Sequence, residues 1–354
     1  MYVGIIHNNP LEYVANKAGL VANPLIKTQI AYTMAKSIMA AVEVGLFESL
    51  QQQPANSQTV ASLCQTNLKA TTMLLNAMVS CEYLNYNKND ETYSLTDSAK
   101  KWLIKSSPHS ICDKLIFQNY EWEYLNQLVP YIRSDQPIEL HHHSDTTQWH
   151  SYQKAMSDIG KLALNEVNSR IPIPKHATKM LDIGGSGGTY SAAFVKSRPQ
   201  LQSLILDLPQ AVVHAQSIVE SHIQSLQLSE NKLSIQAGNA LQDDLGQDQY
   251  DFIFLGNVAH HLSAEQNQLL TFKVQRALKE NGVFCILEPA RTQATSKKSQ
   301  FGSLLDLYFG LTSQSGTWAV AEMQNWMKMA NLKIGSVISL RTAPGVVLIY
   351  GTKL

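Results

Sequence analysis

The feature that most constrains this chain is a run of glycines that follows an apolar segment. The run reads Leu-Asp-Ile-Gly-Gly-Ser-Gly-Gly over residues 181–188, and a stretch typical of a helix follows it at 190–195. Asp207 comes twenty residues after Gly187. Glycine lets a backbone turn sharply and approach a ligand closely because it has no Cβ atom. An acid at the end of the next strand suits the hydroxyls of a ribose, so the pattern predicts a site for an adenosine-bearing cofactor.

The spacing of the glycines indicates which cofactor. A nicotinamide fingerprint needs Gly-x-Gly-x-x-Gly, but counting from Gly185 the third position is Tyr190, and counting from Gly184 the second is Ser186. A nucleotide-triphosphate loop needs a Lys after its glycines, and none follows here. The remaining pattern resembles the first motif of class I S-adenosylmethionine (SAM) methyltransferases. SAM carries no phosphate, so the neighbouring Asp182 is tolerated; the alternative is an ordinary glycine-rich turn.

The size and composition of the chain fit an enzyme. With 354 residues it is long enough for two domains with a sizeable core. Lys plus Arg equals Asp plus Glu at 28 each, so no overall field attracts nucleic acid or a membrane surface. No apolar run approaches the ~20 residues of a membrane span, and we expect no secretion signal. The cysteines lack CxxC spacing and are expected to be reduced thiols of a cytoplasmic protein: Cys64, Cys81, Cys112 and Cys285.

Pattern changes along the chain predict three parts. An N-terminal arm and winged-helix-like dimerisation domain occupy 1–110, a helical segment that lines the substrate occupies 111–172, and a Rossmann-like domain occupies 173–354. The alternating Ile and Pro residues at 171–174 break the helical pattern before the last part.

The N-terminal part is expected to be an irregular arm followed by helices and one hairpin. The expected elements are an arm at 1–23, helices at 28–50, 57–64 and 68–84, and strands at 83–86 and 92–95, with Ser57 as a helix cap. The recognition helix of a DNA-binding winged-helix domain needs basic side chains to contact the phosphates. Residues 67–79 contain a single basic residue, Lys69. The apolar character of this helix favours packing or dimerisation, so nucleic acid is not an expected partner.

Strand patterns recur through the C-terminal part. They fall at 179–183, 203–207, 233–236, 250–255, 282–287, 333–340 and 345–351. Helical stretches separate the first five, which predicts a parallel sheet with right-handed crossovers. A four-residue turn at 341–344 joins the last two as a hairpin, so one of them must run antiparallel. The predicted fold class is therefore α/β, a Rossmann-like sheet with one antiparallel strand.

Ligands of an open α/β sheet sit at the carboxyl ends of its strands. His260 and His261 follow one apolar strand, and Ser263 begins a capping-box pattern directly after them. An imidazole is therefore expected at the mouth of the site, where it suits general-base chemistry near neutral pH. Glu288 closes the next strand and is placed to bind the far nitrogen of that ring and fix its tautomer.

Taken together, these motifs resemble the small-molecule O-methyltransferases of the caffeic-acid and hydroxyindole type, which carry an N-terminal dimerisation domain. The resemblance covers about residues 25–354. Residues 206–209 resemble the family's D-L-P motif, 238–240 its G-D-M motif and 260–263 its H-D-W-S motif. The resemblance implies His260, not His261, as the base, with Glu288 and Glu322 as the glutamates that hold it.

The resemblance also implies two binding sets and a homodimer. Strand ends and motifs together predict that SAM is bound by Asp182, Gly184, Gly185, Gly187, Asp207, Leu208, Asn239, Ala240, Gly256 and Asn257. The acceptor is expected to contact Trp149, Tyr152, Met156, Asp306, Tyr308 and Phe309. Departures from the family occur at Asn239, Gly256, His261, Leu262 and Ala319, and they weaken any transfer of substrate preference.

The chemistry expected of such a site is in-line methyl transfer to a small molecule held within a near-attack distance. If the acceptor is a hydroxyl, His260 takes its proton, an effect worth ~10²–10⁴ in rate. If the acceptor is a thioether or an unprotonated amine, no base is needed. Methylation of sulfur, nitrogen or carbon on the same scaffold therefore stays open, as does a SAM-sensing regulator without turnover.

Two histidine clusters resemble metal sites in composition, but neither is expected to hold a metal ion. The run at 141–143 lies in a polar stretch, and adjacent side chains cannot all face one ion. The pair at 260–261 would need a carboxylate to build a non-haem iron site. Arg291 is expected at the surface, with an acidic substrate as the alternative partner.

Overall fold

The computed structural model describes residues 4–138, 146–229, 231–295, 297–313 and 315–354. The chain divides into two compact units, one that ends at Tyr120 and one that runs from Glu121 to Leu354. We call them the N-terminal unit and the C-terminal unit. The sequence placed a boundary at 110 and a separate segment at 111–172, whereas the residues from Glu121 onward cluster with the C-terminal unit.

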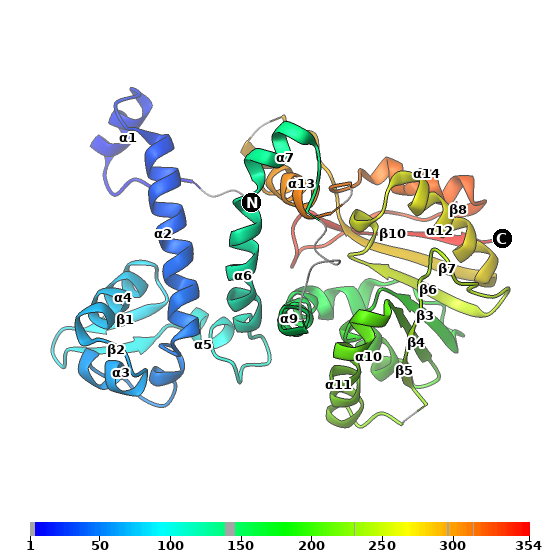
Figure 1. Ribbon diagram of the computed structural model, residues 1–354, viewed down its shortest axis with the longest axis horizontal. Coiled ribbons are helices and arrows are strands. Elements are labelled where there is room, and N and C mark those ends of the chain that lie inside the picture. The colour runs from blue at the N-terminus through cyan, green and yellow to red at the C-terminus, as the bar shows by residue number, and fades with distance from the viewer. Residues whose placement is uncertain (1–3, 139–145, 230, 296, 314) are drawn as a thin grey trace. The chain divides into compact units, whose positions relative to one another are not determined.

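The N-terminal unit is mainly helical, with one two-stranded hairpin (Figure 1). Its elements are α1 (Pro10–Lys17), α2 (Asn23–Glu43), η1 (Glu48–Leu50), α3 (Ser57–Leu63), α4 (Leu68–Ser80), β1 (Leu84–Asn87), β2 (Thr92–Leu95), α5 (Asp97–Trp102) and α6 (Cys112–Leu125), whose last residues belong to the next unit. The predicted hairpin is confirmed, with Leu84 opposite Leu95 in an antiparallel pair. Apolar side chains from α2, α4 and the hairpin form its core, including Phe47, Leu75 and Met78.

The predicted irregular arm is wrong, because part of it forms helix α1. The Asn9 side chain accepts a hydrogen bond from the backbone N–H of Glu12 at 3.0 Å, and Pro10 occupies the first turn. An Asn cap followed by Pro is a strong helix start. Helix α2 begins at Asn23 and not at residue 28.

Two further helix ends in this unit differ from the prediction. The helix expected at 28–50 ends at Glu43, because Gly45 adopts a left-handed conformation with φ of +73°. The cap of α3 is Asn56, whose side chain accepts from the N–H of Thr59 at 2.9 Å, and not Ser57. The helix expected at 68–84 ends at Ser80.

The C-terminal unit is an α/β fold with the predicted mostly parallel sheet. The strands are β3 (Lys179–Ile183), β4 (Gln202–Asp207), β5 (Leu233–Ala237), β6 (Tyr250–Gly256), β7 (Leu278–Pro289), β8 (Leu332–Ile334), β9 (Ile338–Ser339) and β10 (Val346–Lys353). Their order is β5-β4-β3-β6-β7-β10-β8, and β9 pairs with β10. Strands β3 to β7 are parallel, while β10 runs antiparallel to β7, β8 and β9. The predicted antiparallel strand near the C-terminus is thus confirmed as β10, which pairs with the preceding strands β8 and β9.

Helices cover both faces of this sheet (Figure 1). The helices of this unit are α7 (Leu128–Ser134), α9 (Thr146–Arg170), α10 (Thr189–Ser197), α11 (Pro209–Ser225), α12 (Ala264–Ala277), α13 (Gln300–Thr312) and α14 (Val320–Met329). Helices α9, α10 and α11 lie on one side, and α12 and α14 on the other. Successive side chains of a strand point to opposite faces. Accordingly Phe252 and Phe254 pack in the core with α9 and α10, whereas Ile253 and Leu255 pack in the core with α12 and α14.

The strand expected at 333–340 is interrupted. It forms β8 and β9, with Gly335 between them. The N–H of Gly335 donates to the carbonyl of Tyr350 at 2.9 Å, and a Cβ here would lie 2.1 Å from the Tyr350 ring. The ring therefore occupies the space that a side chain at position 335 would need, and the regular strand is interrupted here.

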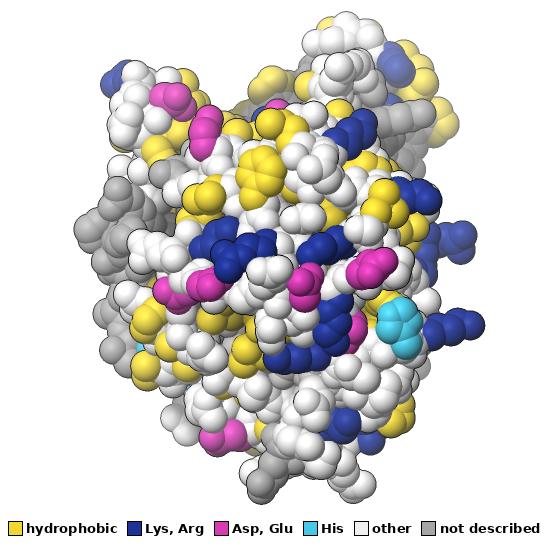
Figure 2. Space-filling view, turned by 90° about the vertical axis from the view of Figure 1, so that its right-hand side faces the viewer, with side chains coloured by type: hydrophobic (Ala, Val, Ile, Leu, Met, Phe, Trp, Pro, Cys, Tyr) yellow, Lys and Arg dark blue, Asp and Glu magenta, His cyan; other side chains and the backbone are white. Residues whose placement is uncertain are grey.

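The surface carries mixed charge. On the face shown in Figure 2, Lys and Arg side chains are interspersed with Asp and Glu. Because charges of both signs are mixed on this face, it lacks the large positive patch that is typical of nucleic-acid binding. Within the described part of the chain, no helix is both long and apolar enough to cross a membrane.

Candidate active site

The glycine loop joins β3 to α10, and its backbone packs closely against the side chains of Val258 and Asp182. Gly184 has a φ of +67°, and a Cβ there would lie 2.6 Å from Val258 Cγ2. A Cβ at Gly185 would lie 2.6 Å from the carboxyl carbon of Asp182. Side chains at these positions would therefore clash or strain the backbone. The loop presents backbone, not side chains, at the carboxyl end of β3.

Asp182 supports this loop from the sheet side. It is buried, and its Oδ2 accepts a hydrogen bond from the Ser191 hydroxyl at 2.6 Å, which in turn lies 2.8 Å from the Ser203 hydroxyl. Burial raises the pKa of Asp182 to about 7, an effect that the Ser191 bond opposes and the charge of Asp207 reinforces. A direct contact of this buried carboxyl with a cofactor stays a prediction.

Asp207 ends β4 beside the same loop. Its two oxygens accept from the N–H groups of Ser186 and Leu208, each at 2.8 Å. Burial raises the pKa of this carboxyl, and the two N–H bonds oppose the rise. The Ser186 hydroxyl donates to the side chain of Gln153, a buried residue of α9. Loop, acid and helix α9 are thus joined in one hydrogen-bonded arrangement.

Four further residues predicted to bind the cofactor follow or end β5 and β6, the strands on either side of β4 and β3. Asn239 uses its side chain locally, since its Oδ1 accepts from the N–H of Leu241 at 3.0 Å. Ala240 is half-buried next to it. Gly256 ends β6, and Asn257 continues in a left-handed conformation with its N–H bound to the Leu287 carbonyl at 2.8 Å. Strand order therefore brings these residues to the sheet edge that carries the glycine loop.

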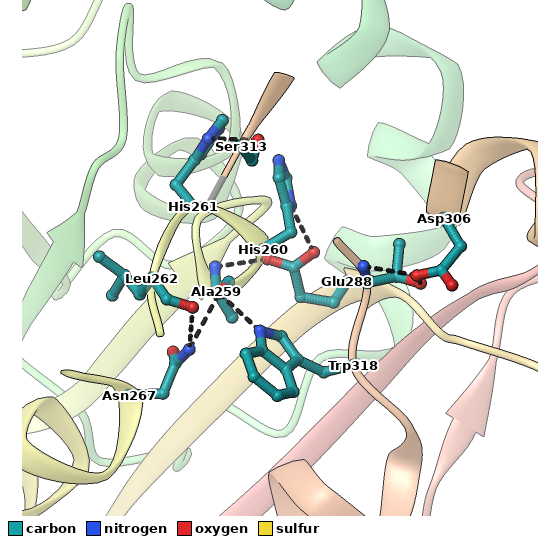
Figure 3. Close-up of polar contacts among 10 residues, drawn as sticks. Ala259, His260, His261, Leu262, Asn267, Glu288, Asp306, Ser313 and Trp318 are labelled. Atoms are coloured by element: carbon teal, nitrogen blue, oxygen red, sulfur yellow. Dashed lines mark hydrogen bonds and ion pairs between the residues drawn. The ribbon is translucent and has the colours of Figure 1, made fainter. Parts of the chain in front are cut away.

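The candidate base is fixed by one glutamate (Figure 3). His260 Nδ1 lies 2.8 Å from Glu288 Oε2, and the two side chains belong to residues only 3% and 1% exposed. The other oxygen of Glu288 accepts from the N–H of Ala259 at 2.6 Å. This arrangement, in which Glu288 contacts the ring as expected, leaves Nε2 as the nitrogen that can exchange a proton with a substrate.

The carbonyl of Ala259 is held as well (Figure 3). It accepts from Trp318 Nε1 at 2.8 Å and from Asn267 Nδ2 at 2.9 Å. Neither donor was singled out in the sequence, although Asn267 sits four residues after the capping serine and Trp318 four residues before Glu322. Both partners become visible only in three dimensions.

Glu322 is placed differently from the expectation that it holds the imidazole. Its Oε2 accepts from Arg291 Nη2 at 2.5 Å and from the N–H of Ala319 at 2.7 Å. None of the hydrogen bonds of the described residues joins Glu322 to His260. Arg291 is likewise not free for an acidic substrate, because it pairs with Glu322 and lies over the Trp318 ring at 5.9 Å.

The predicted acceptor residues divide between two helices. On α13, the Phe309 ring centroid lies 4.0 Å from that of His260, and Tyr308 donates from its hydroxyl to Glu121 at 2.7 Å. Asp306 instead accepts from the N–H and the hydroxyl of Thr317, at 2.8 and 2.6 Å, so it holds the loop before Trp318.

The α9 residues of this set lie near the cofactor side. The rings of Trp149 and Tyr152 meet edge to face at 5.6 Å, and Met156 is half-buried one turn further on. Burial raises the pKa of Tyr152, and the nearby charges of Asp207 and Glu121 add to the rise. Glu121 was missed from the sequence, because it lies 187 residues before its partner Tyr308.

The second histidine contacts the first. The ring centroids of His260 and His261 lie 4.1 Å apart, and His261 Nδ1 lies 3.0 Å from the Ser313 hydroxyl. The histidines at 141–143 fall outside the described residues. Across the part of the chain that is described, no group of three His, Cys, Asp or Glu side chains is arranged to hold a metal ion.

Comparisons with known proteins identify the family of the chain. A family model of the O-methyltransferase domain matches residues 130–331, and a model of the O-methyltransferase dimerisation domain matches residues 27–105. The first model covers more than half of the chain. The chain belongs to the O-methyltransferase family.

Individual relatives of this methyltransferase are distant but span most of its length. The N,N-dimethyltransferase OxyT of Streptomyces rimosus is 21% identical, over 78% of this chain and 80% of that protein. The tetracenomycin polyketide synthesis 8-O-methyl transferase TcmO of Streptomyces glaucescens is 20% identical, over 86% and 90%. A crystal structure of human N-acetylserotonin methyltransferase in complex with SAM superposes with a TM-score of 0.79, 16% identity and 99% coverage of both chains, which establishes the fold.

SAM is the methyl donor of this methyltransferase, as the glycine pattern predicted. The residues present fit the molecule. A loop without side chains at Gly184 and Gly185 leaves room for close approach, and the Asp207 carboxylate at its rim suits a ribose.

Proposed function

We propose that this enzyme methylates a hydroxyl oxygen of a small molecule, with His260 as the general base. The observation that carries the proposal is the contact of His260 Nδ1 with Glu288, buried at the carboxyl end of the strand next to the glycine loop. A ring held at Nδ1 by a carboxylate presents Nε2 as its basic nitrogen.

The residues would act as follows. When bound, SAM supplies a methyl group on a cationic sulfur. His260 Nε2 takes the proton that the acceptor hydroxyl loses, and Glu288 stabilises the imidazolium that results. Because both side chains are buried, their attraction is stronger than it would be in water. Phe309 and the α9 residues Trp149, Tyr152 and Met156 line the acceptor, while Asp207 binds the ribose.

Replacing the base tests this proposal. His260→Ala is expected to lower kcat by ~10²–10⁴, because only proton transfer is lost. Calorimetry with S-adenosylhomocysteine should give an unchanged Kd, since His260 lies outside the cofactor set. His176→Ala, a change of an exposed histidine in the same unit, is the control and should leave both values unchanged. Full turnover by His260→Ala would refute the assignment of the base.

Methyl transfer to nitrogen is a second candidate, favoured by the similarity to the N,N-dimethyltransferase OxyT. An unprotonated amine attacks without a base, so His260 would then only position it. In that case kcat would vary little with pH across the histidine range, and His260→Ala would keep most of its activity. An oxygen acceptor predicts a fall in kcat on the acidic side of the profile.

The N-terminal unit is proposed to form a homodimer in the cytoplasm. The dimerisation model matches 27–105, and apolar side chains of α1 and α2 are exposed, among them Leu25 at 62% and Ile30 at 59%. Apolar groups this exposed along one helix are typical of an interface. The four described cysteines are free thiols, as suits a reducing compartment.

A further inference from the structure

The turn that carries His260 is held through the N–H and the carbonyl oxygen of the preceding residue, Ala259. Ala259 donates its N–H to Glu288 and accepts at its carbonyl from Trp318 and Asn267. Glu288 belongs to β7, Trp318 to the segment before α14, and Asn267 to α12 (Figure 3). Three elements that are separate in sequence therefore fix one peptide unit on each side of Ala259.

The two donors to the carbonyl are themselves rigidly placed. Asn267 is 2% exposed, and its amide lies within 3.1 Å of the Leu262 and Ser263 carbonyls as well. Trp318 is buried against the Trp326 ring, with centroids 5.1 Å apart. Side chains locked by packing can hold a catalytic group within a fraction of an ångström.

Trp318 is also tied to Glu322. The N–H of Arg291 donates to the Trp318 carbonyl at 2.9 Å, and the guanidinium of Arg291 pairs with Glu322. Glu322 in addition caps the start of α14 through the N–H of Ala319. A path of direct contacts thus runs from Glu322 through Arg291 and Trp318 to the carbonyl next to His260.

We infer that Trp318 and Asn267 are positioning residues for the base, and that Glu322 acts on His260 through Trp318 and not by direct contact. The inference rests on the proposed role of His260. Its physical reason is that rotation of the Ala259–His260 peptide would swing the imidazole away from both Glu288 and the acceptor, and small misplacements of a reacting group cost large factors in rate.

The test is Trp318→Phe, which removes the indole donor and keeps an aromatic ring in the core. We expect kcat to fall about tenfold with unchanged KM for SAM, because only the placement of the base changes. The control is Trp326→Phe, the same substitution in the neighbouring ring, whose indole nitrogen has no hydrogen bond among the described residues. Trp326→Phe should lose as much thermal stability as Trp318→Phe but keep the kcat of the unmodified enzyme.

Nuclear magnetic resonance gives a readout that folding alone would not move. The Nδ1 proton shared by His260 and Glu288 should shift in Trp318→Phe and in Asn267→Ala and stay unchanged in Trp326→Phe. Assignment comes from its absence in His260→Ala. An unshifted proton together with an unchanged kcat in Trp318→Phe would overturn the inference, whereas full activity of His260→Ala would instead overturn the proposed function.

A double-mutant cycle tests the link to Glu322. Glu322→Gln and Trp318→Phe are expected to be non-additive, the double variant losing no more rate than Trp318→Phe alone, because both act on the same carbonyl. Independent, multiplying losses would mean that Glu322 does not act through Trp318 and would refute that part of the inference.

Discussion

At the scale of single residues, the site depends on carboxyl groups that serve different purposes. Glu288 uses one oxygen for His260 and the other for the backbone of Ala259. Asp207 faces the glycine loop with both oxygens bound to N–H groups. Asp182 is buried beneath the loop with a hydroxyl partner. Burial and partners, more than residue type, decide what each acid can do.

The substitution Glu288→Gln should separate the effect of the carboxylate charge on kcat from the effect of the side chain's size. The amide keeps the size of the side chain but cannot stabilise an imidazolium, so kcat should fall by about 10²-fold with SAM affinity unchanged. Steady-state kinetics with calorimetry measure this. Glu280→Gln, an exposed residue of the same strand, serves as the control. A kcat equal to that of the unmodified enzyme would show that the charge on Glu288 is not used.

Gly185→Ala should weaken cofactor binding. The added methyl would lie 2.6 Å from the Asp182 carboxyl carbon, so the loop must shift. Overpacking of this kind costs about 1–3 kcal/mol, which corresponds to a roughly 5- to 150-fold higher Kd for SAM if the strain falls on the loop. Gly160→Ala is the control, because its Cβ would lie 3.3 Å from Thr189 Cγ2, and this variant should bind SAM normally. Equal Kd values for both variants would contradict the prediction.

Asp182 should make stability depend on pH. Its folded-state pKa of about 7 lies above the ordinary value of 3.8. The stabilising contribution of the protonated carboxyl is therefore complete below about pH 4 and is lost as the pH rises through about 7. Urea unfolding between pH 4 and pH 8 should show this decline, and Asp182→Asn, which stays neutral, should flatten it.

At the scale of elements, helix α9 is anchored at both ends of its buried face. Near its start Gln153 binds Ser186 of the glycine loop, and near its end Glu166 binds the turn between β9 and β10. The Glu166 carboxylate accepts from the N–H groups of Arg341 and Thr342 at 2.8 to 3.0 Å. The helix that carries three of the proposed acceptor residues is thereby fixed at positions far apart in the chain.

Glu166→Gln should lower stability in a pH-dependent way. Burial raises the pKa of Glu166, but the N–H bonds from Thr342 and Arg341 outweigh it and bring the pKa to about 2. The contribution is therefore present above about pH 4.5 and lost as the pH falls toward 2. We expect the variant to be less stable by about 1–2 kcal/mol at pH 7. Urea unfolding at pH 7 and pH 3 measures the difference, which should shrink at the lower pH.

At the scale of the whole molecule, the two units have separate cores. The N-terminal unit buries its own apolar set around Phe47 and Leu75. The C-terminal unit buries both faces of its sheet. Exposed apolar residues on α1 and α2 remain outside either core, which is why we assign them to a second copy of the chain.

Ile30→Glu should disrupt the proposed dimer. A carboxylate in an apolar interface must be desolvated without a partner, which costs several kcal/mol. Size-exclusion chromatography with light scattering should show a monomer. Gln29→Glu adds the same charge at the neighbouring exposed position of α2 and tests the effect of charge alone. An unchanged dimer in Ile30→Glu would remove this face from the proposed interface.

Local patterns in the sequence predicted the mostly parallel sheet of the C-terminal unit and, through the resemblance of the glycine run to a SAM methyltransferase motif, the cofactor. The glycine run, the acid of β4 and the alternation of strands and helices follow from backbone sterics and side-chain periodicity, which act over a few residues. The same local reasoning placed an imidazole of the His260–His261 pair and Glu288 at the site, because parallel strands end at one edge. The choice of His260 over His261 came from the family resemblance. It failed at helix ends, where the side-chain bond of Asn9 or the left-handed Gly45 decided the boundary.

Only the tertiary structure decided how the candidate base His260 is supported. Trp318 reaches a carbonyl 59 residues away, Tyr308 reaches Glu121 across 187 residues, and Glu322 turns to Arg291 instead of the imidazole. Such contacts depend on how whole elements pack, because a side chain with several possible donors and acceptors takes the partner that packing brings within about 3 Å. The chemistry of this enzyme is therefore encoded locally, while its geometry is set by the assembled sheet and helices.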